Sequence, residues 1–144
     1  MKSFLHNLLF SLLFLFLPVS VLAAPDLVVE SVDAPSAASV GDTISVLVTY
    51  KNQGTDLTRG SYVVCRMIIS PDKSINLADN IYEDENISNT YLKAGFSVSK
   101  TYNYTLQNDL EGTYYIGAYV DAYVDGSGNT YHAESNENNN ANYD

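Results

Sequence analysis

Apolar and polar residues alternate along most of this chain, and that period of two decides which folds are open to it. Between residues 43 and 52 every second side chain is apolar, namely Ile44, Val46, Val48 and Tyr50. Successive side chains of a β-strand point to opposite sides, so this pattern is typical of a strand with one buried face. No stretch keeps a helical period over three turns. The sequence therefore predicts an all-β protein.

Turn residues separate the alternating segments at intervals of roughly 8–12 residues, which is typical of an antiparallel sandwich or barrel of six or seven strands. The strongest strands are expected at 27–32, 43–52, 62–69, 96–106 and 113–124. Short or irregular strands are expected within 81–92, and a strand at 130–133 is expected to pair back across a turn.

A charged residue sets the expected register of one strand, and a second charged residue lies on the expected inward face of another. Placing Arg66 outward turns four residues inward, which also buries the single cysteine: Val63, Cys65, Met67 and Ile69. The inward face of 96–106 is expected to carry Phe96, Val98, Tyr102, Tyr104 and Leu106. Lys100 shares that face, so we expect it near a sheet edge, where its amine reaches water.

The first 23 residues have the layout of a signal peptide. Lys2 provides a positive start, residues 8–17 form an apolar run, and Pro18 ends it before the small residue Ala23. The run is shorter than the roughly 20 apolar residues that span a bilayer. We expect cleavage after Ala23, with Ala24 as the near alternative. The protein is therefore expected to be secreted (extracellular, cell-surface or periplasmic), with no membrane span after cleavage and one domain at 24–144.

The composition of the remaining chain excludes several classes of function. Lys2 is removed with the signal peptide, so the remaining chain has 17 acidic and six basic residues. This excess of negative charge excludes binding through nucleic-acid phosphates. A single cysteine excludes a disulfide framework and a multi-thiolate metal site. His132 is the only histidine after cleavage, and no nucleophile lies beside it. The sequence predicts a non-catalytic module with no catalytic residues.

Short motifs along the chain resemble the CARDB family, a cell-adhesion-related domain of bacterial and archaeal surface proteins. In order, the matching segments are Pro25-Asp26-Leu27-Val28-Val29, Val40-Gly41-Asp42, Lys51-Asn52-Gln53-Gly54, Ser70-x-Asp72 with Asp79, Leu92-x-Ala94-Gly95, Gly112-x-Tyr114, Val120-Asp121 and Glu134-Ser135-Asn136-Glu137-x-Asn139-Asn140. The resemblance covers residues 24–144. It implies an immunoglobulin-like antiparallel β-sandwich of about seven strands, and adhesion or binding outside the cell, usually as one module of a larger protein.

The chain departs from the family pattern in three ways. It is one module long, and Lys100 occupies a position that is commonly apolar. Members usually continue past the Asn-Asn pair with a final alternating strand, whereas only residues 140–144 remain here. The sheet edge beside this segment is therefore expected to be open, and a partner chain is a candidate to donate a strand to it.

Acidic residues in the connections are candidates for a calcium site, and no other cofactor is expected. The candidates are Asp72, Asp79, Asp121, Asp125, Glu134 and Glu137. Calcium binds six to eight oxygen ligands, which acidic loops between strands can supply. Asp125-x-Ser127-x-Asn129 begins like an EF-hand loop, but Thr130 stands where that loop has glycine and Asn136 where it has glutamate. The alternative is a set of solvated turns, which use Asp and Asn for local hydrogen bonds.

Tyrosines form the second candidate site. Tyr115, Tyr119 and Tyr123 are expected on the face opposite Ile116 and Val120. An exposed tyrosine stacks on sugars or anchors a protein partner, while tyrosines paired across strands also stabilise a sheet. The expected function is recognition of an extracellular protein or carbohydrate ligand. The alternatives are a calcium-stabilised structural spacer and an incomplete sandwich that accepts a strand from another chain.

Overall fold

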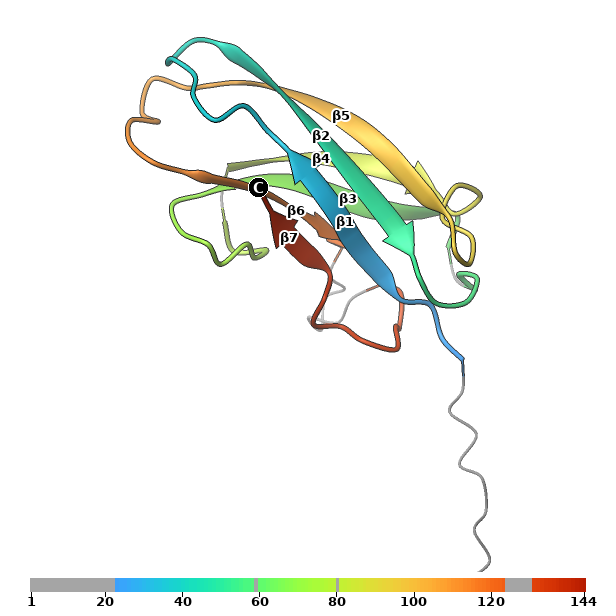
Figure 1. Ribbon diagram of the computed structural model, residues 1–144. Coiled ribbons are helices and arrows are strands. Elements are labelled where there is room, and N and C mark those ends of the chain that lie inside the picture. Colours follow the sequence, from blue (N-terminus) through green and yellow to red (C-terminus); the bar gives the residue numbers. More distant parts are fainter. Residues whose placement is uncertain (1–22, 59, 80, 124–130) are drawn as a thin grey trace, which may run out of the picture.

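Seven β-strands form two antiparallel sheets in the computed structural model, which describes residues 23–58, 60–79, 81–123 and 131–144. The strands are β1 (Leu27–Asp33), β2 (Thr43–Asn52), β3 (Tyr62–Ser70), β4 (Ile81–Ser88), β5 (Ser97–Thr105), β6 (Tyr115–Val120) and β7 (Ala141–Tyr143) (Figure 1). The described residues contain no helix, and so none that is long and apolar enough to cross a membrane. The expected signal peptide lies outside the described residues except for Ala23.

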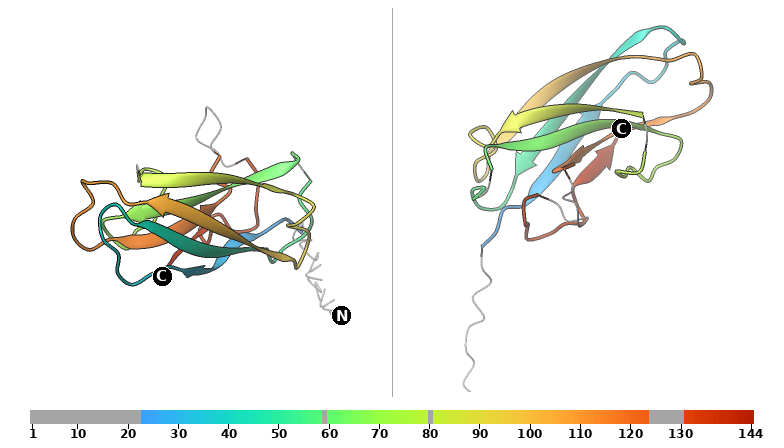
Figure 2. Two further views of the ribbon diagram at one scale, coloured as in Figure 1. Left: turned by 90° about the horizontal axis from the view of Figure 1, so that it is seen from above. Right: turned by 180° about the vertical axis from the view of Figure 1, so that it is seen from behind.

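The two sheets pack face to face as an immunoglobulin-like sandwich, as expected (Figure 2). One sheet has the strand order β1-β2-β5 and the other β4-β3-β6-β7. In antibody constant domains the fourth strand lies in the sheet of the first, second and fifth. Here β4 instead pairs with β3 along its whole length, from Tyr62 opposite Ser88 to Ile69 opposite Ile81.

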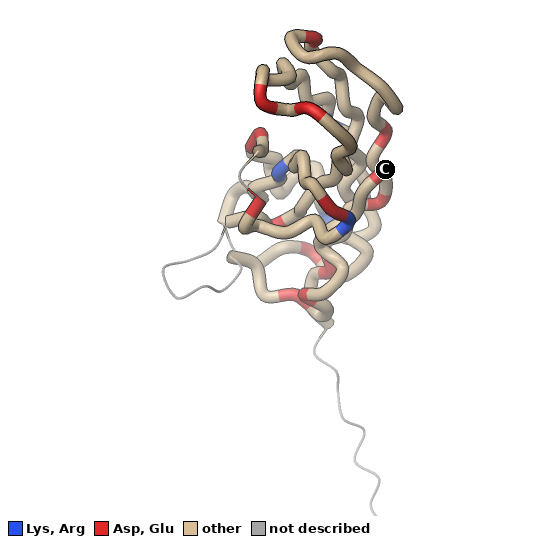
Figure 3. Tube along the Cα trace, turned by 90° about the vertical axis from the view of Figure 1, so that its left-hand side faces the viewer, with Lys and Arg blue, Asp and Glu red and all other residues tan. Residues whose placement is uncertain are grey.

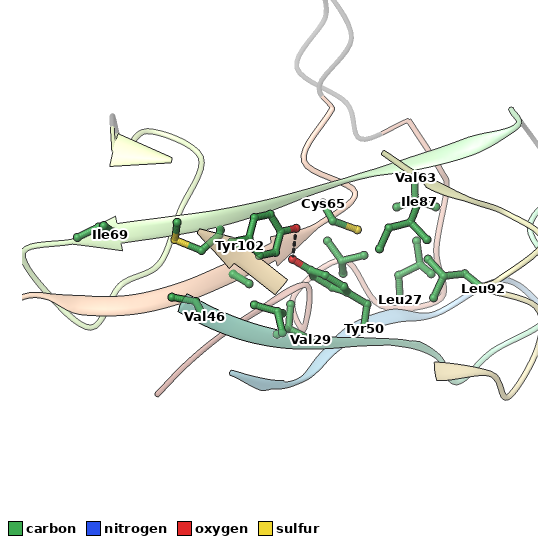
Figure 4. Packing of buried hydrophobic residues seen from close by; sticks show 14 of the residues in the cluster. Leu27, Val29, Val46, Tyr50, Val63, Cys65, Ile69, Ile87, Leu92 and Tyr102 are labelled. Carbon is green, nitrogen blue, oxygen red and sulfur yellow. Dashed lines mark hydrogen bonds between the residues drawn. The ribbon is translucent and has the colours of Figure 1, made fainter. Parts of the chain in front are cut away.

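The alternating residues fill the space between the sheets, which confirms the predicted inward faces of β2 and β3 (Figure 4). The buried set comprises Ile44, Val46, Val48 and Tyr50 from β2 and Val63, Cys65, Met67 and Ile69 from β3. Cys65 is fully buried, so its thiol is withdrawn from oxidants. The hydroxyls of Tyr50 and Tyr102 meet in the core at 2.8 Å.

Three local expectations were wrong. Residues 81–88 form one regular strand, because a strand at a sheet edge needs only β3 as a partner and tolerates its acidic run. Phe96 is 60% exposed, because it closes the turn after Gly95, ahead of the first residue of β5. The described part of the expected strand at 130–133 is not extended, and β6 pairs with β7 instead.

Lys100 lies on the edge strand β5, as expected, and points into the gap between the two sheets. Its Nζ contacts Oε1 of Glu85 on β4 at 2.7 Å, so one ion pair joins the two sheet edges on this side. Inward-pointing charges on edge strands oppose pairing with other chains. This role explains why the inner face of β5 carries a lysine.

A buried asparagine explains the Lys51-Asn52-Gln53-Gly54 segment. Oδ1 of Asn52 accepts hydrogen bonds from the amides of Asp26 and Gly54, and Nδ2 donates to the carbonyls of Thr55 and Leu92. A Cβ on Gly54 would lie 2.4 Å from the Ala24 carbonyl oxygen, so only glycine allows the chain to pass this closely. The segment therefore holds the start of β1 against two other connections.

The C-terminal strand is short but is paired. β7 lies beside β6, with Gly117 opposite Tyr143 and Tyr119 opposite Ala141, and forms the edge of its sheet. The amide of Asp144 donates to the Ile116 carbonyl and so extends the pairing by one bond. Donation of a strand by a partner at this edge stays a prediction.

Candidate functional site

The connection from β6 to β7 gathers acidic side chains at one end of the sandwich. Asp121 follows β6 directly, and its φ of 55° is a left-handed conformation that few residues other than glycine adopt. Asp is among the residues that tolerate it, at a cost of about 1–3 kcal/mol. Such strain persists only where the surroundings fix it, and it concentrates at functional sites.

The Asp121 carboxylate is buried beside the backbone amides of Tyr131 and His132. Oδ2 accepts a hydrogen bond of 2.8 Å from the His132 amide, while Oδ1 has no hydrogen-bond partner among the described residues. Burial raises the pKa of Asp121, and the backbone amides of His132 and Tyr131 oppose this shift. A buried oxygen with no partner carries a desolvation penalty, so a positive charge held near this carboxylate would be favourable.

Glu134 and Glu137 lie close enough to Asp121 to affect its charge. Glu134 accepts hydrogen bonds from the Leu27 amide and, at 2.8 Å, from Asn140 Nδ2. Burial raises the pKa of Glu134 to about 7, and these two hydrogen bonds oppose the shift. Oε1 of Glu137 accepts from the Glu134 amide at 2.9 Å. Both glutamates therefore have a structural role, which is to hold this connection and the start of β1 in place.

Two buried amide oxygens nearby also lack partners. Oδ1 of Asn139 and Oδ1 of Asn140 accept no hydrogen bond from any residue that the structure describes, although both side-chain amide nitrogens donate, to Asp26 and to Glu134 respectively. Carboxylate and amide oxygens are calcium ligands. In the described part of the chain, however, no three His, Cys, Asp or Glu side chains are arranged to hold a metal ion.

The other calcium candidates are not part of this cluster. Asp72 and Asp79 lie in the β3–β4 connection, at the opposite end of β3, where their oxygens accept from the Ser74 and Asn76 amides. These are local turn contacts. Asp125 lies outside the described residues. Acidic residues occur at both ends of the sandwich in Figure 3, so the candidates divide between the two ends.

A pocket of about 210 Å³ opens at the same end as Asp121, which lines it. Three tyrosines contribute to its wall: Tyr62, Tyr123 and Tyr131. The rings of Tyr123 and Tyr131 stand nearly perpendicular, at 88°, with centroids 5.7 Å apart. We call this the tyrosine pocket. A Cβ on Gly60 would lie 2.6 Å from Cε1 of Tyr131, so the glycine makes room for that ring.

The structure separates the three tyrosines singled out from the sequence. Tyr115 and Tyr119 are half-buried on the outer face of β6, where Tyr115 packs edge-on against Tyr143. Tyr123 lies beyond the end of β6, in the tyrosine pocket, and is 52% exposed. Tyr62 and Tyr131 were not identified as site residues from the sequence. They lie 69 positions apart, and only the pairing of β3 with β6 brings the start of β3 close to the end of β6.

Comparisons with known proteins place the chain among adhesion-related domains. A family model described as CARDB matches residues 24–144. A similar solved structure is the crystal structure of the CARDB domain of a Pyrococcus furiosus protein in complex with di-metal ions. It has a TM-score of 0.60 and 25% sequence identity, and the match covers 85% of this chain and 91% of that chain. A search among curated proteins gave no match.

Proposed function

The chain belongs to the CARDB family, and we propose that it is an exported, non-catalytic module that recognises an extracellular protein or carbohydrate ligand. The tyrosine pocket is the observation that carries this proposal. It combines exposed aromatic rings with a buried carboxylate, the mixture of apolar area and few polar groups that is typical of ligand sites.

The position of the pocket supports recognition. It lies at the end of the sandwich, where connecting segments meet and the sheets are not covered. Binding residues are concentrated on such connections because a rigid scaffold positions them. The side chains of Tyr62 and Tyr123 are each about half exposed, so a partner can reach their rings.

An array of glycans and extracellular matrix proteins tests the proposal. We expect the purified protein to bind a subset of the array and Tyr123→Ala to lose that binding, since truncating a central aromatic contact commonly costs more than about 2 kcal/mol. Tyr143→Ala is the matched control, because Tyr143 is also exposed but lies on β7, outside the pocket. Equal binding by wild type and Tyr123→Ala would contradict the assignment of the pocket.

A second candidate function is structural stabilisation by a divalent cation such as calcium. The observation that favours it is a set of oxygens, on Asp121, Asn139 and Asn140 beside Glu134 and Glu137, that have no hydrogen-bond partner within the described ranges. The Pyrococcus furiosus domain was crystallised with two metal ions, which supports a cation site in the family. Because the described side chains do not converge on one point, a cation would have to draw them together.

Thermal unfolding with and without calcium tests this second function. A ligand that binds only the folded state at a hundred times its Kd stabilises by about 2.7 kcal/mol. For a domain of this size we expect the Tm to rise by about 10 °C and to fall again on chelation. Glu137→Gln should abolish the shift, while Asp72→Asn, at the other end of β3, should leave it unchanged. A Tm that does not change on addition of calcium, magnesium or manganese would exclude the cation site.

A further inference from the structure

The tyrosine pocket has walls that stand at right angles. Tyr123 and Tyr131 meet edge to face at 88°, and the Tyr131 ring makes a second perpendicular contact with His132, with centroids 5.0 Å apart. Tyr62 completes the lining from the start of β3. Perpendicular rings can contact a small ligand from several sides, whereas coplanar rings can contact it from one side only.

A buried negative charge lies in the same pocket. Asp121 is fully buried, Oδ2 is occupied by the His132 amide, and Oδ1 has no partner in the described residues. The left-handed backbone at Asp121 holds the carboxylate in this place. Placing a carboxylate with an unused oxygen in a pocket is unfavourable unless a ligand compensates it.

We propose that the tyrosine pocket binds an ammonium group, which the buried carboxylate of Asp121 in the pocket wall neutralises and the rings of Tyr62, Tyr123 and Tyr131 surround. This inference rests on the proposed recognition function and names the chemistry of its ligand. Cations bind to the faces of aromatic rings through the negative charge density of the ring, and several rings around one quaternary or primary amine form an aromatic cage. The large excess of acidic residues attracts cationic ligands towards the protein.

Other ligands fit the pocket less well. A sugar stacks on one broad ring face, and it would leave the carboxylate without a positive charge beside it. A calcium ion needs six to eight oxygen ligands and prefers several carboxylates, while the described lining offers one carboxylate beside the hydroxyls of Ser61 and the three tyrosines. The volume of about 210 Å³ accommodates the end of a lysine side chain or a choline-sized group.

Titration with two ammonium compounds tests the proposal and distinguishes their sources. Choline represents a small quaternary ammonium ligand, and N-acetyl-lysine amide represents a lysine side chain of a partner protein. The neutral isostere of choline, with carbon in place of nitrogen, is the control ligand. Tyrosine ring signals in NMR spectra at constant ionic strength report binding. We expect saturable shifts with at least one ammonium compound and none with the isostere.

Variants locate the binding. Asp121→Asn keeps a residue that tolerates the left-handed backbone, and Tyr123→Leu keeps apolar bulk at an exposed position, so both should fold. Each is expected to weaken ammonium binding by about tenfold or more, because Tyr123→Leu removes a cation–π contact and Asp121→Asn removes the opposite charge. Tyr143→Ala should bind like wild type. Thermal unfolding of each variant confirms that the fold is intact.

The outcomes separate this inference from the function on which it rests. Binding of the isostere as strong as that of choline, or no effect of Asp121→Asn, would overturn the ammonium assignment. If neither ammonium compound binds while array binding still depends on Tyr123, the pocket recognises a different group and only this inference fails. If the array is also silent, the proposed function fails with it. Tighter binding of the lysine compound supports a protein partner, and tighter binding of choline supports a small ligand.

Discussion

Two tyrosine hydroxyls in the core allow the energetics of the sandwich to be tested with a double-mutant cycle. Tyr50 on β2 and Tyr102 on β5 are 0% and 6% exposed, and their hydroxyl oxygens lie 2.8 Å apart. Each hydroxyl has the other as its partner in the structure. Burial raises the pKa of both side chains, so both stay protonated at neutral pH and the contact is a neutral hydrogen bond.

The expected cost differs between the two single variants. Tyr102→Phe leaves the hydroxyl of Tyr50 fully buried without a partner, which costs about 2 kcal/mol, within the range of 1–3 for an orphaned polar group. Tyr50→Phe leaves the hydroxyl of the slightly exposed Tyr102, at a cost of about 1 kcal/mol. The double variant removes both polar groups while keeping both rings, so it is expected to cost less than about 1 kcal/mol. The coupling energy is then about 2 kcal/mol.

Equilibrium unfolding in urea, followed by circular dichroism, measures these differences. With an m-value of about 2 kcal/mol/M, the midpoint of Tyr102→Phe should fall by about 1 M and that of the double variant should return close to wild type. If the free energy of unfolding of the double variant falls by the sum of the two single decreases, the hydroxyls do not interact and the proposed hydrogen bond does not contribute to stability. A changed m-value would show that the variants alter more than this contact.

Three further predictions follow from single sites. In metal-free buffer, the raised pKa of Glu134 means that the folded state binds a proton more tightly than the unfolded state. The free energy of unfolding of the wild type, measured relative to that of Glu134→Gln, should therefore fall by about 1–2 kcal/mol as the pH rises from about 5 to 8. This range allows for the partial exposure of Glu134. A difference that does not change with pH would contradict the prediction. Gly54→Ala should lower the free energy of unfolding by about 2–3 kcal/mol, because the added Cβ would clash with the backbone of Ala24 and Asp26. Gly41→Ala, where the added atom meets open space, should lower it by about 1 kcal/mol. Equal losses in thermal unfolding would refute the packing argument. Lys100→Met should change the Tm little, because the Glu85 pair is partly exposed, but should increase aggregation measured by light scattering, and an unchanged aggregation rate would argue against its role at the edge.

Alternation along the chain was sufficient to predict the sandwich, because burial of every second side chain is a local property of each strand. Ile44, Val46 and Val48 were placed in the core correctly on this basis. Arg66 fixed the register of β3 and so buried Cys65, since a one-residue slip would have placed a guanidinium in the core. The family motifs indicated the same fold, and the CARDB match to residues 24–144 confirms it.

The tertiary structure decided what lies at the ends of the strands. Phe96 was misplaced because the hydrogen bonds of a turn, and not the alternation, end that segment. Asp121 was singled out from its sequence as one acidic residue among several, and only the fold shows its left-handed backbone and its oxygen that no described residue contacts by a hydrogen bond.

The tyrosine pocket shows the same division. Tyr123 was a sequence candidate, while Tyr62 and Tyr131 become its neighbours through strand pairing between distant segments. A strand pattern is encoded locally and can be read from consecutive residues. A binding site between the ends of non-consecutive strands depends on which strands pair and where each one stops, and long-range packing sets both.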